Sequence, residues 1–564
     1  MSTDPPLQDD LRWAADFDPA DPSLGLRWDE LSSAAMDRRR FMRVALGAGA
    51  VGTLSRMLAA RPAAAQGRPG GELKIGWNIR EFANLDPAYQ NLAVYFMVAS
   101  NVMGGLTHVD VDLTPRGDLA ERWEVTPDGL TWTFHLRQGV RWHNGDRFTA
   151  DDVIYTFNRT RDPATASPHK PVLDPIDRLA KLDDHTVRFH LKVPAASFLM
   201  KITERSSGRA LTIVNQRAVR ELGKDGHNRR PVGTGPFRIV EHRLGERLVL
   251  EKFPDYYLKD RPRVDRVTIF NIEESATLIS ALESGQVDFV NQVPEALYAR
   301  VKANPDLVVL VQDHPGFEPL WFNLCPPDEK REKIGKEKLP TDDVRVRLAM
   351  AKAVNRDEMI KRALFGLGVP AYGPVNKAQK LYWSDLGEVS PQRYDLNEAK
   401  RLLAEAGYAG GFKMKLLTAP AYRRLGEVLA DIYRKALNIE FELEVVDFPV
   451  WVQRYLKGVY ELSLIGSYAD PDPDDSIDDY FPTKAKFNGF CYSSPKVDEL
   501  NALQRRTTDV AARKRVVNEI LDLLARDAPG AFLYHQKDIV AHRKHVSGFT
   551  FIPGLRDLDT ITVS

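Results

Sequence analysis

The window Gly117–Arg159 constrains the fold of this chain more than any other stretch, because three local signals agree in it. Trp123 and Val125 alternate with polar residues, and after a Pro-Asp-Gly turn apolar and polar residues alternate again. This pattern predicts a β-hairpin. Thr149 and, three residues later, Asp152 form a capping box that predicts the start of a helix. Together these signals predict a small α+β unit with an aromatic face.

The same window carries a longer pattern from Leu119 to Tyr155. It reads L-A-x-x-W-x-x-x-x-D-G-x-x-W-x-F-x-L-R-x-G-V-x-W-x-N-G-x-x-F-x-A-x-D-V-x-Y. This order of residues resembles the extracytoplasmic solute-binding proteins of family 5, which serve peptide and nickel ABC importers. A second signature of that family, P-V-G-T-G-P-F, occupies residues 231–237. The resemblance covers essentially everything after about Gly71.

The resemblance implies a fold and a division of the chain. The fold is α/β, the two-lobed periplasmic-binding-protein fold of class II and large cluster C type, with an extra α+β hairpin subdomain in the first lobe. Two segments are expected to cross between the lobes, near Glu318–Leu324 and Ala528–His535. The expected parts are a signal peptide and tail (1–65), the first-lobe core (66–106 and 227–320), the hairpin subdomain (107–226), the second lobe (321–530) and a return to the first lobe (531–564).

Helical and strand patterns alternate from about Leu320 onward. Examples are a helix over 342–354, a strand over 413–417, a helix over 424–437 and a strand over 440–446. Such alternation predicts a lobe in which helices cover both faces of a sheet.

Composition excludes some partners. Lys+Arg and Asp+Glu both total 78, so the formal net charge is zero, and 43% of the residues are hydrophobic. A balanced chain has no global field that would attract nucleic acid or an anionic membrane surface. We expect an ordinary globular protein that binds neither.

The N-terminus predicts where the protein acts. Arg38, Arg39 and Phe41 fit the twin-arginine export pattern R-R-x-F-(L/M)-(K/R), and an Ala/Gly-rich run and a small-residue cleavage site follow. We expect export by the twin-arginine translocase and cleavage after Ala65. No cysteine lies near that site, so we expect a protein free in the periplasm and not a lipoprotein.

Motifs for cofactors, metals and catalysis are rejected. Residues 47–52 spell G-x-G-x-x-G, but arginines and not a strand precede them. Asp470, Asp472 and Asp474 alternate as in a calcium loop, yet the glycine and glutamate that such a loop needs are absent. The chain has no G-x-S-x-G and no H-E-x-x-H. We expect no enzymatic activity, no cofactor and no metal.

Cys325 and Cys491 are the two cysteines of the chain. They would meet an oxidising compartment, which permits a disulfide. Twin-arginine export, however, folds the protein first in a reducing cytosol. This favours two buried free thiols, and a disulfide between them is the alternative that the sequence leaves open.

The segment Gly466–Asp475 is the strongest candidate for ligand binding. In peptide-binding members of the family, the equivalent segment holds an aspartate that takes the α-ammonium group of the ligand. The resemblance assigns that role to Asp470, with Tyr468 and Asp472 beside it. The alternative is an acidic turn, since Asp and Pro are favoured in turns.

Three other places are expected to line the cleft. Tyr89 and Asn91 follow the first strand, where the family presents groups to its ligand. Trp321 lies on the first crossing segment, and aromatic walls are common in concave sites. Arg423 lies between a strand and a helix, where it could hold a carboxylate with two hydrogen bonds. For each of these residues a purely structural role is the alternative.

The resemblance implies the binding component of an ABC importer that closes on a small polar solute, most simply a di- or oligopeptide, and passes it to the permease subunits in the membrane. A monomer is expected. The alternatives are a sugar, an opine or a metal chelate as ligand, or an exported hydrolase on the same scaffold.

Overall fold

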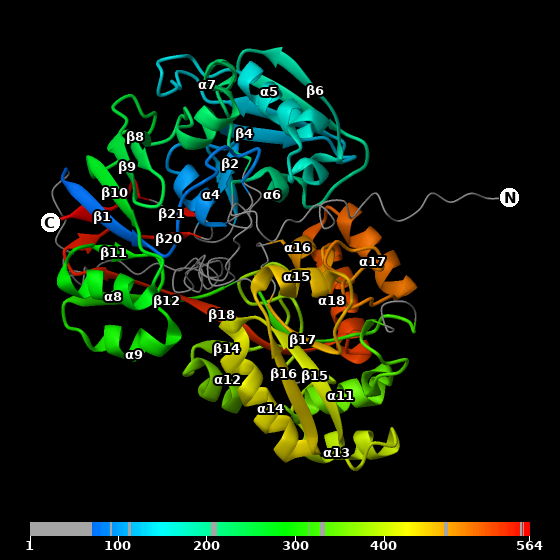
Figure 1. Ribbon diagram of the computed structural model, residues 1–564. Coiled ribbons are helices and arrows are strands. Elements are labelled where there is room, and N and C mark those ends of the chain that lie inside the picture. The colour runs from blue at the N-terminus through cyan, green and yellow to red at the C-terminus, as the bar shows by residue number, and fades with distance from the viewer. Residues whose placement is uncertain are drawn as a thin grey trace, which may run out of the picture.

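The computed structural model describes residues 70–90, 93–110, 114–204, 211–314, 316–327, 333–387, 389–466, 472–552, 555–556 and 558–564. The chain forms two lobes, and the long strand β18 runs from one to the other (Figure 1). The expected two-lobed α/β fold is confirmed. Among the described helices, none is both long and apolar enough to cross a membrane.

One sheet continues through both lobes in the order β16-β15-β17-β13-β18-β11-β1-β10-β9-β8, and β12 and β14 also pair with β18. Its first-lobe strands are β1 (Glu72–Trp77), β8 (Phe237–Arg243), β9 (Arg247–Lys252), β10 (Arg266–Asn271), β11 (Phe289–Val290) and β12 (Leu307–Asp313). Its other strands are β13 (Glu318–Phe322), β14 (Gly368–Pro370), β15 (Phe412–Thr418), β16 (Ile439–Val445), β17 (Leu462–Leu464) and β18 (Gly530–Arg543).

The chain passes between the lobes along two adjacent strands. β18 pairs with β12 up to the pair Asp313–Lys537, and with β13 from the pair Glu318–Tyr534 onward. Both pairings are antiparallel. The hinge between the lobes therefore consists of the short connection from β12 to β13 and of the middle of β18.

The hairpin subdomain has the structure that its sequence predicts. β4 (Ala120–Val125) pairs antiparallel with β5 (Thr131–Leu136), which places Trp123 opposite Phe134. α5 (Ala150–Arg161) begins with the Thr149 capping box, in which the Asp152 carboxylate accepts a hydrogen bond of 3.1 Å from the Thr149 N–H. The remaining elements are β2 (Thr107–Val109), β3 (Pro115–Gly117), η3 (Pro163–Thr165), η4 (Lys170–Leu173), β6 (Ile176–Asp183), β7 (Thr186–Leu191), α6 (Phe198–Ile202) and α7 (Gln216–Arg229).

Helices cover the rest of the sheet. The first lobe has α4 (Ala93–Ala99), α8 (Ser275–Ser284), α9 (Glu295–Ala303) and the short strands β19 (Val546–Ser547), β20 (Phe551–Ile552), β21 (Leu555–Arg556) and β22 (Thr562–Val563). The second lobe has η5 (Pro340–Asp342), α11 (Val344–Ala353), α12 (Arg356–Leu364), α13 (Leu396–Glu405), η6 (Pro420–Tyr422), α14 (Arg423–Leu437), α15 (Phe448–Leu456), α16 (Pro473–Ile477), α17 (Pro495–Arg506) and α18 (Val510–Asp527).

Buried apolar side chains form separate clusters along the chain. One cluster draws its buried members from residues 317–534, a second from 106–213, and a third joins residues 73–289 to 540–561. In the third cluster, apolar residues of the C-terminal segment complete the core that begins at β1. The C-terminal segment is therefore part of the first lobe.

Cys325 and Cys491 form a disulfide, so the expectation of two free thiols is wrong. Their Cα atoms lie 4.7 Å apart although the residues are separated by 166 positions. The Leu324 N–H donates to the Phe490 carbonyl at 2.9 Å, which aligns the two backbones directly beside the cysteines. This proximity arises from tertiary packing, which the spacing of two cysteines in the sequence does not reveal.

Reducing this disulfide is expected to lower the free energy of unfolding by about 2–4 kcal/mol, because the bridge restricts the unfolded chain. Urea denaturation with and without dithiothreitol measures the effect. The double variant C325A/C491A is the control, and the reductant should leave its stability unchanged. A wild-type curve that does not respond to the reductant would contradict the pairing.

Candidate functional site

The second-lobe sheet places several polar side chains at its edge toward the first lobe. β15 and β17 are parallel, so Tyr422 and Gly466, which follow them, lie at the same edge. β13 is antiparallel to β17, and its first residue, Glu318, therefore lies there too. Ligands of α/β sheets bind at the carboxyl ends of parallel strands. We call Glu318, Tyr422, Gly466, Tyr534 and Gln536 the crossing edge.

Glu318 is the centre of the crossing edge. Its side chain is 1% exposed, and its Oε1 accepts hydrogen bonds from the Tyr422 hydroxyl, at 3.2 Å, and from the Gln536 amide. The Gly466 N–H donates to the same tyrosine oxygen at 3.4 Å. A Cβ added at Gly466 would lie 1.7 Å from Glu318 Oε1, so only glycine fits over this carboxylate.

The other carboxylate oxygen of Glu318, Oε2, is buried, and no group in the described part of the chain bonds to it. Burial raises the pKa of Glu318 well above its ordinary value, although the hydrogen bonds from Tyr422 and Gln536 oppose the shift. Burial, and then the charge of Glu318, also raises the pKa values of Tyr422 and Tyr534. Glu318 is thus a buried acidic group that has no positive partner among the residues that the structure describes.

Replacing Glu318 with glutamine is expected to stabilise the fold increasingly as the pH rises. The folded protein keeps the Glu318 proton at pH values where the unfolded chain has lost it, so this residue costs stability above the unfolded pKa of about 4.3. The glutamine side chain of the variant has no titratable proton, so it does not carry this cost. Denaturant unfolding of both proteins between about pH 4 and 8 measures the difference, and parallel stability curves would contradict the account.

The segment that follows Gly466 contains the strongest predicted site residues. Tyr468 and Asp470 lie outside the described residues, and the description resumes at Asp472. Asp472 caps α16, and its two carboxylate oxygens accept bonds of 2.7 Å each from Arg513. Asp472, predicted as a ligand contact, therefore uses its carboxylate to anchor the end of the segment.

Trp321, predicted as a wall of the cleft, lies in the core beneath the segment. Its side chain is 1% exposed and stacks on Phe490, with ring centres 4.3 Å apart. Its indole N–H donates to the Ile465 carbonyl at 3.2 Å. In this structure Trp321 supports the strand that carries the segment and offers almost no surface to a ligand.

Tyr89, Asn91 and Arg423 were the remaining predicted contacts. Tyr89 is half-buried in the first lobe, where Lys224 lies 4.4 Å and Arg159 5.4 Å from the centre of its ring. Asn91 lies outside the described residues. Arg423 is exposed at the first position of α14, directly after the crossing-edge residue Tyr422.

Sequence reasoning missed Glu318 and Gln536. Glu318 begins a strand whose other residues are apolar or proline, so an acidic residue in a buried run was the available signal. Its partners Tyr422 and Gln536 are 104 and 218 positions away, and no local pattern connects them.

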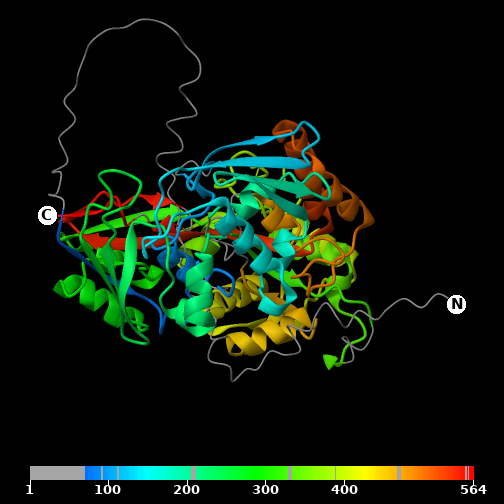
Figure 2. The ribbon, with the colours of Figure 1, turned by 90° about the horizontal axis from the view of Figure 1, so that it is seen from above.

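The hairpin subdomain touches the second lobe beside α6. Lys201 Nζ lies 2.9 Å from Asp474 Oδ2, and the Ser197 hydroxyl donates to the same oxygen at 2.7 Å. The Ala196 N–H donates to the Arg505 carbonyl at 2.8 Å. Figure 2 shows the hairpin strands extending toward the helices of the second lobe. We call Ser197, Lys201 and Asp474 the interlobe contact, and its presence means that the lobes are closed here.

Asp474 is well suited to hold this contact. Its side chain is 0% exposed, and its Oδ1 accepts from the Gln504 amide at 2.6 Å. Burial alone would raise the pKa of Asp474, but Lys201, Arg513 and Arg505 hold it well below its ordinary value. The aspartate is therefore ionised in the closed structure and attracts Lys201 across the boundary.

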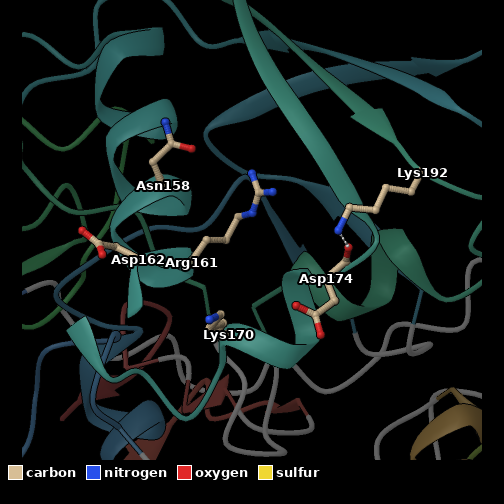
Figure 3. Close-up of a pocket in the computed structure, with 6 residues that line it drawn as sticks. All are labelled: Asn158, Arg161, Asp162, Lys170, Asp174 and Lys192. Carbon is tan, nitrogen blue, oxygen red and sulfur yellow. Dashed lines mark hydrogen bonds between the residues drawn. The ribbon is translucent and has the colours of Figure 1, made fainter. Parts of the chain in front are cut away.

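A surface recess of about 360 Å³ lies within the hairpin subdomain, away from the crossing edge (Figure 3). It is lined by Asn158, Arg161, Asp162, Lys170, Asp174 and Lys192. The Lys192 ammonium donates to the Asp174 carbonyl at 2.8 Å, and Arg161 donates to the Ile176 carbonyl at 2.8 Å. Two of its three cations are thus already bonded to backbone, and all of its lining comes from one subdomain. Among the described residues, no three His, Cys, Asp or Glu side chains come together as a metal site.

Known proteins share this architecture. The family model for bacterial extracellular solute-binding proteins, family 5 Middle, matches residues 114–488. The glutathione-binding protein GsiB of Pectobacterium atrosepticum is 28% identical over 486 residues, which cover 84% of this chain and 90% of that protein. The periplasmic binding protein DppA of Helicobacter pylori, in complex with the peptide STSA, is 26% identical with a TM-score of 0.72, covering 88% of this chain and 98% of that one. AgaA of A. tumefaciens R10, in complex with agropinic acid, is 26% identical with a TM-score of 0.71, covering 88% and 99%.

Proposed function

Because the chain belongs to the bacterial extracellular solute-binding proteins, family 5, we propose that it is the substrate-binding component of an ABC importer and that its ligand is a di- or oligopeptide. Support for a peptide comes from relatives that are named for binding glutathione or are seen with a bound tetrapeptide, STSA. The observation that carries the proposal is the position of the crossing edge, a polar site at the carboxyl ends of parallel strands beside the hinge.

Binding works by closure of the lobes. A ligand that contacts both lobes stabilises the closed state by the difference between its contacts in the closed and open states. Asp470 takes the ligand amine and Arg423 its carboxylate, and Tyr468, Tyr89 and Asn91 contribute further contacts. Trp321 and Asp472 hold the binding segment in place through Ile465 and Arg513. In the division that the resemblance implies, the second lobe spans residues 321–530, and closure would move this part of the chain against the first lobe.

Export and delivery follow from the N-terminal signal. Arg38, Arg39 and Phe41 direct the chain to the twin-arginine translocase, cleavage occurs after Ala65, and the monomer works in the periplasm. The closed form then docks on the permease subunits of the importer. The protein binds its solute without converting it, as the name of its family implies.

A non-peptide solute such as an opine is the second candidate. The relative in complex with agropinic acid favours it, since that chain is as similar to this one as the peptide-bound relative. Small-angle X-ray scattering with di-, tri- and tetrapeptides and with agropinic acid separates the two candidates. The radius of gyration should fall on addition of peptide. Compaction by agropinic acid and by no peptide would overturn the peptide assignment.

Replacing Lys201 with methionine is expected to speed ligand release about tenfold, since the variant loses a mostly buried, charge-assisted hydrogen bond of about 1.5 kcal/mol that exists only when the lobes meet. Stopped-flow dissociation of the best-bound peptide measures the rate. Lys181→Met is the matched control, because Lys181 pairs with Asp151 and Asp184 within the same subdomain. Equal rates for both variants would show that the interlobe contact does not hold the closed state.

A further inference from the structure

One face of the crossing strands carries a row of polar side chains. Tyr534, Gln536 and Asp538 are alternate residues of β18 and so lie on one face of it. Glu318 is the direct partner of Tyr534, and Gln312 of β12 is the direct partner of Asp538. Directly opposite residues of antiparallel strands lie on the same face. Gln312 and Glu318 therefore face the same side of the hinge, one from each lobe.

Both of these side chains are buried and incompletely bonded. Gln312 is 3% exposed and Glu318 is 1% exposed. Among the described residues, neither amide atom of Gln312 has a hydrogen-bond partner, and Oε2 of Glu318 has none either. The large majority of buried side-chain polar atoms in native proteins are bonded, so two such side chains on one face of the hinge require an explanation.

The chemistry of these unbonded atoms indicates which kind of group would bind them. Oε1 of Glu318 already accepts two hydrogen bonds, whereas Oε2 is an acceptor without a donor. The groups that bond to Glu318 are neutral, a tyrosine hydroxyl and a glutamine amide. A buried carboxylate is stable in its charged form only when a cation pairs with it. Burial raises the pKa of Glu318, so a cation placed beside Oε2 would offset the cost of ionising this carboxylate.

We propose that Glu318 and Gln312 form a subsite for a cationic group of the ligand, an ammonium or guanidinium such as the side chain of lysine or arginine in a bound peptide. This subsite rests on the proposed function and is distinct from Asp470, which takes the α-amine. Gln312 accepts from the same cation through its amide oxygen. Because Gln312 comes from β12 and Glu318 from β13, a cation held between them also contacts both sides of the hinge.

The test is competitive capture by the protein stripped of bound ligand, read by native mass spectrometry. The probe is a mixture of tripeptide pairs that differ only in lysine against norleucine, together with arginine, agmatine and spermidine. Wild type should enrich the lysine peptides about tenfold or more over their norleucine partners, as expected for a hydrogen bond to a charged group. Glu318→Gln should lose the preference for lysine over norleucine, whatever its overall affinity for peptides.

Glu461→Gln is the matched control, because Glu461 is also buried but pairs with Lys336 away from the hinge. It should keep the lysine preference. Thermal unfolding of each variant checks that it is folded, and Gln312→Met provides a second variant, which should reduce the preference.

Three outcomes decide between the two proposals. Equal binding of lysine and norleucine peptides by wild type would overturn the subsite and leave peptide binding intact. Binding of agmatine or spermidine by wild type but not by Glu318→Gln, with no peptide bound, would overturn the peptide assignment and support the subsite. Retention of no basic compound and no peptide would overturn both.

Discussion

Replacing Arg513 with methionine should lower the free energy of unfolding by about 3–5 kcal/mol, the range observed when one partner of a buried ion pair is removed. Arg513 is 1% exposed and bonds to both oxygens of Asp472, whose side chain is 8% exposed. It also lies 3.7 Å from Asp474, which is fully buried. Without Arg513, Asp472 loses this cation, and the cations that remain beside Asp474 among the described residues are Lys201 and Arg505.

The same change is expected to depend on pH. Asp474 has a lowered pKa in the folded protein, so its ion pairs contribute stability above the unfolded pKa of about 3.9, and this contribution is lost as the pH falls through the folded pKa. The destabilisation by Arg513→Met should therefore shrink toward acid pH. Urea unfolding across the pH range measures it, with Arg515→Met on the exposed side of the same helix as control. Equal stabilities of the two variants at neutral pH would refute the role of Arg513.

Replacing Asp470 with asparagine should weaken peptide binding about a hundredfold, because loss of one partner of a buried charge pair costs about 2–5 kcal/mol. In a closed cleft the ligand ammonium loses its water, and the carboxylate is the group that compensates for this. Isothermal titration with the best-bound peptide measures the loss.

The matched control for this prediction is the N-acetylated form of the same peptide. It carries no α-ammonium, so wild type and Asp470→Asn should bind it with similar, weak affinity. If Asp470→Asn bound the free-amine peptide as tightly as wild type, Asp470 would not be the amine contact.

Elements encoded by short-range signals could be predicted from the sequence. The hairpin of β4 and β5 follows from alternation around a turn, and α5 begins where the Thr149 capping box predicts. α8 ends at Gly285, which adopts the left-handed conformation expected of a glycine that terminates a helix. In each case neighbouring residues contain the whole signal.

Features that depend on contacts between distant residues could not be predicted. The disulfide joins cysteines 166 positions apart. The crossing edge brings Glu318 together with residues of three other segments. The aromatic character of Trp321 suggested a cleft wall, but an aromatic residue on a strand does not reveal which of its faces is covered. Here the side chains of Phe490 and Tyr480 stack on its ring.

The most direct test of peptide binding is native mass spectrometry of the protein purified from its own host. If the lobes close around the solute as proposed, the solute should be retained through purification. We predict a co-purifying mass that fragments as a peptide, with basic residues over-represented. A saccharide or a metal complex in its place, with no peptide, would contradict the account.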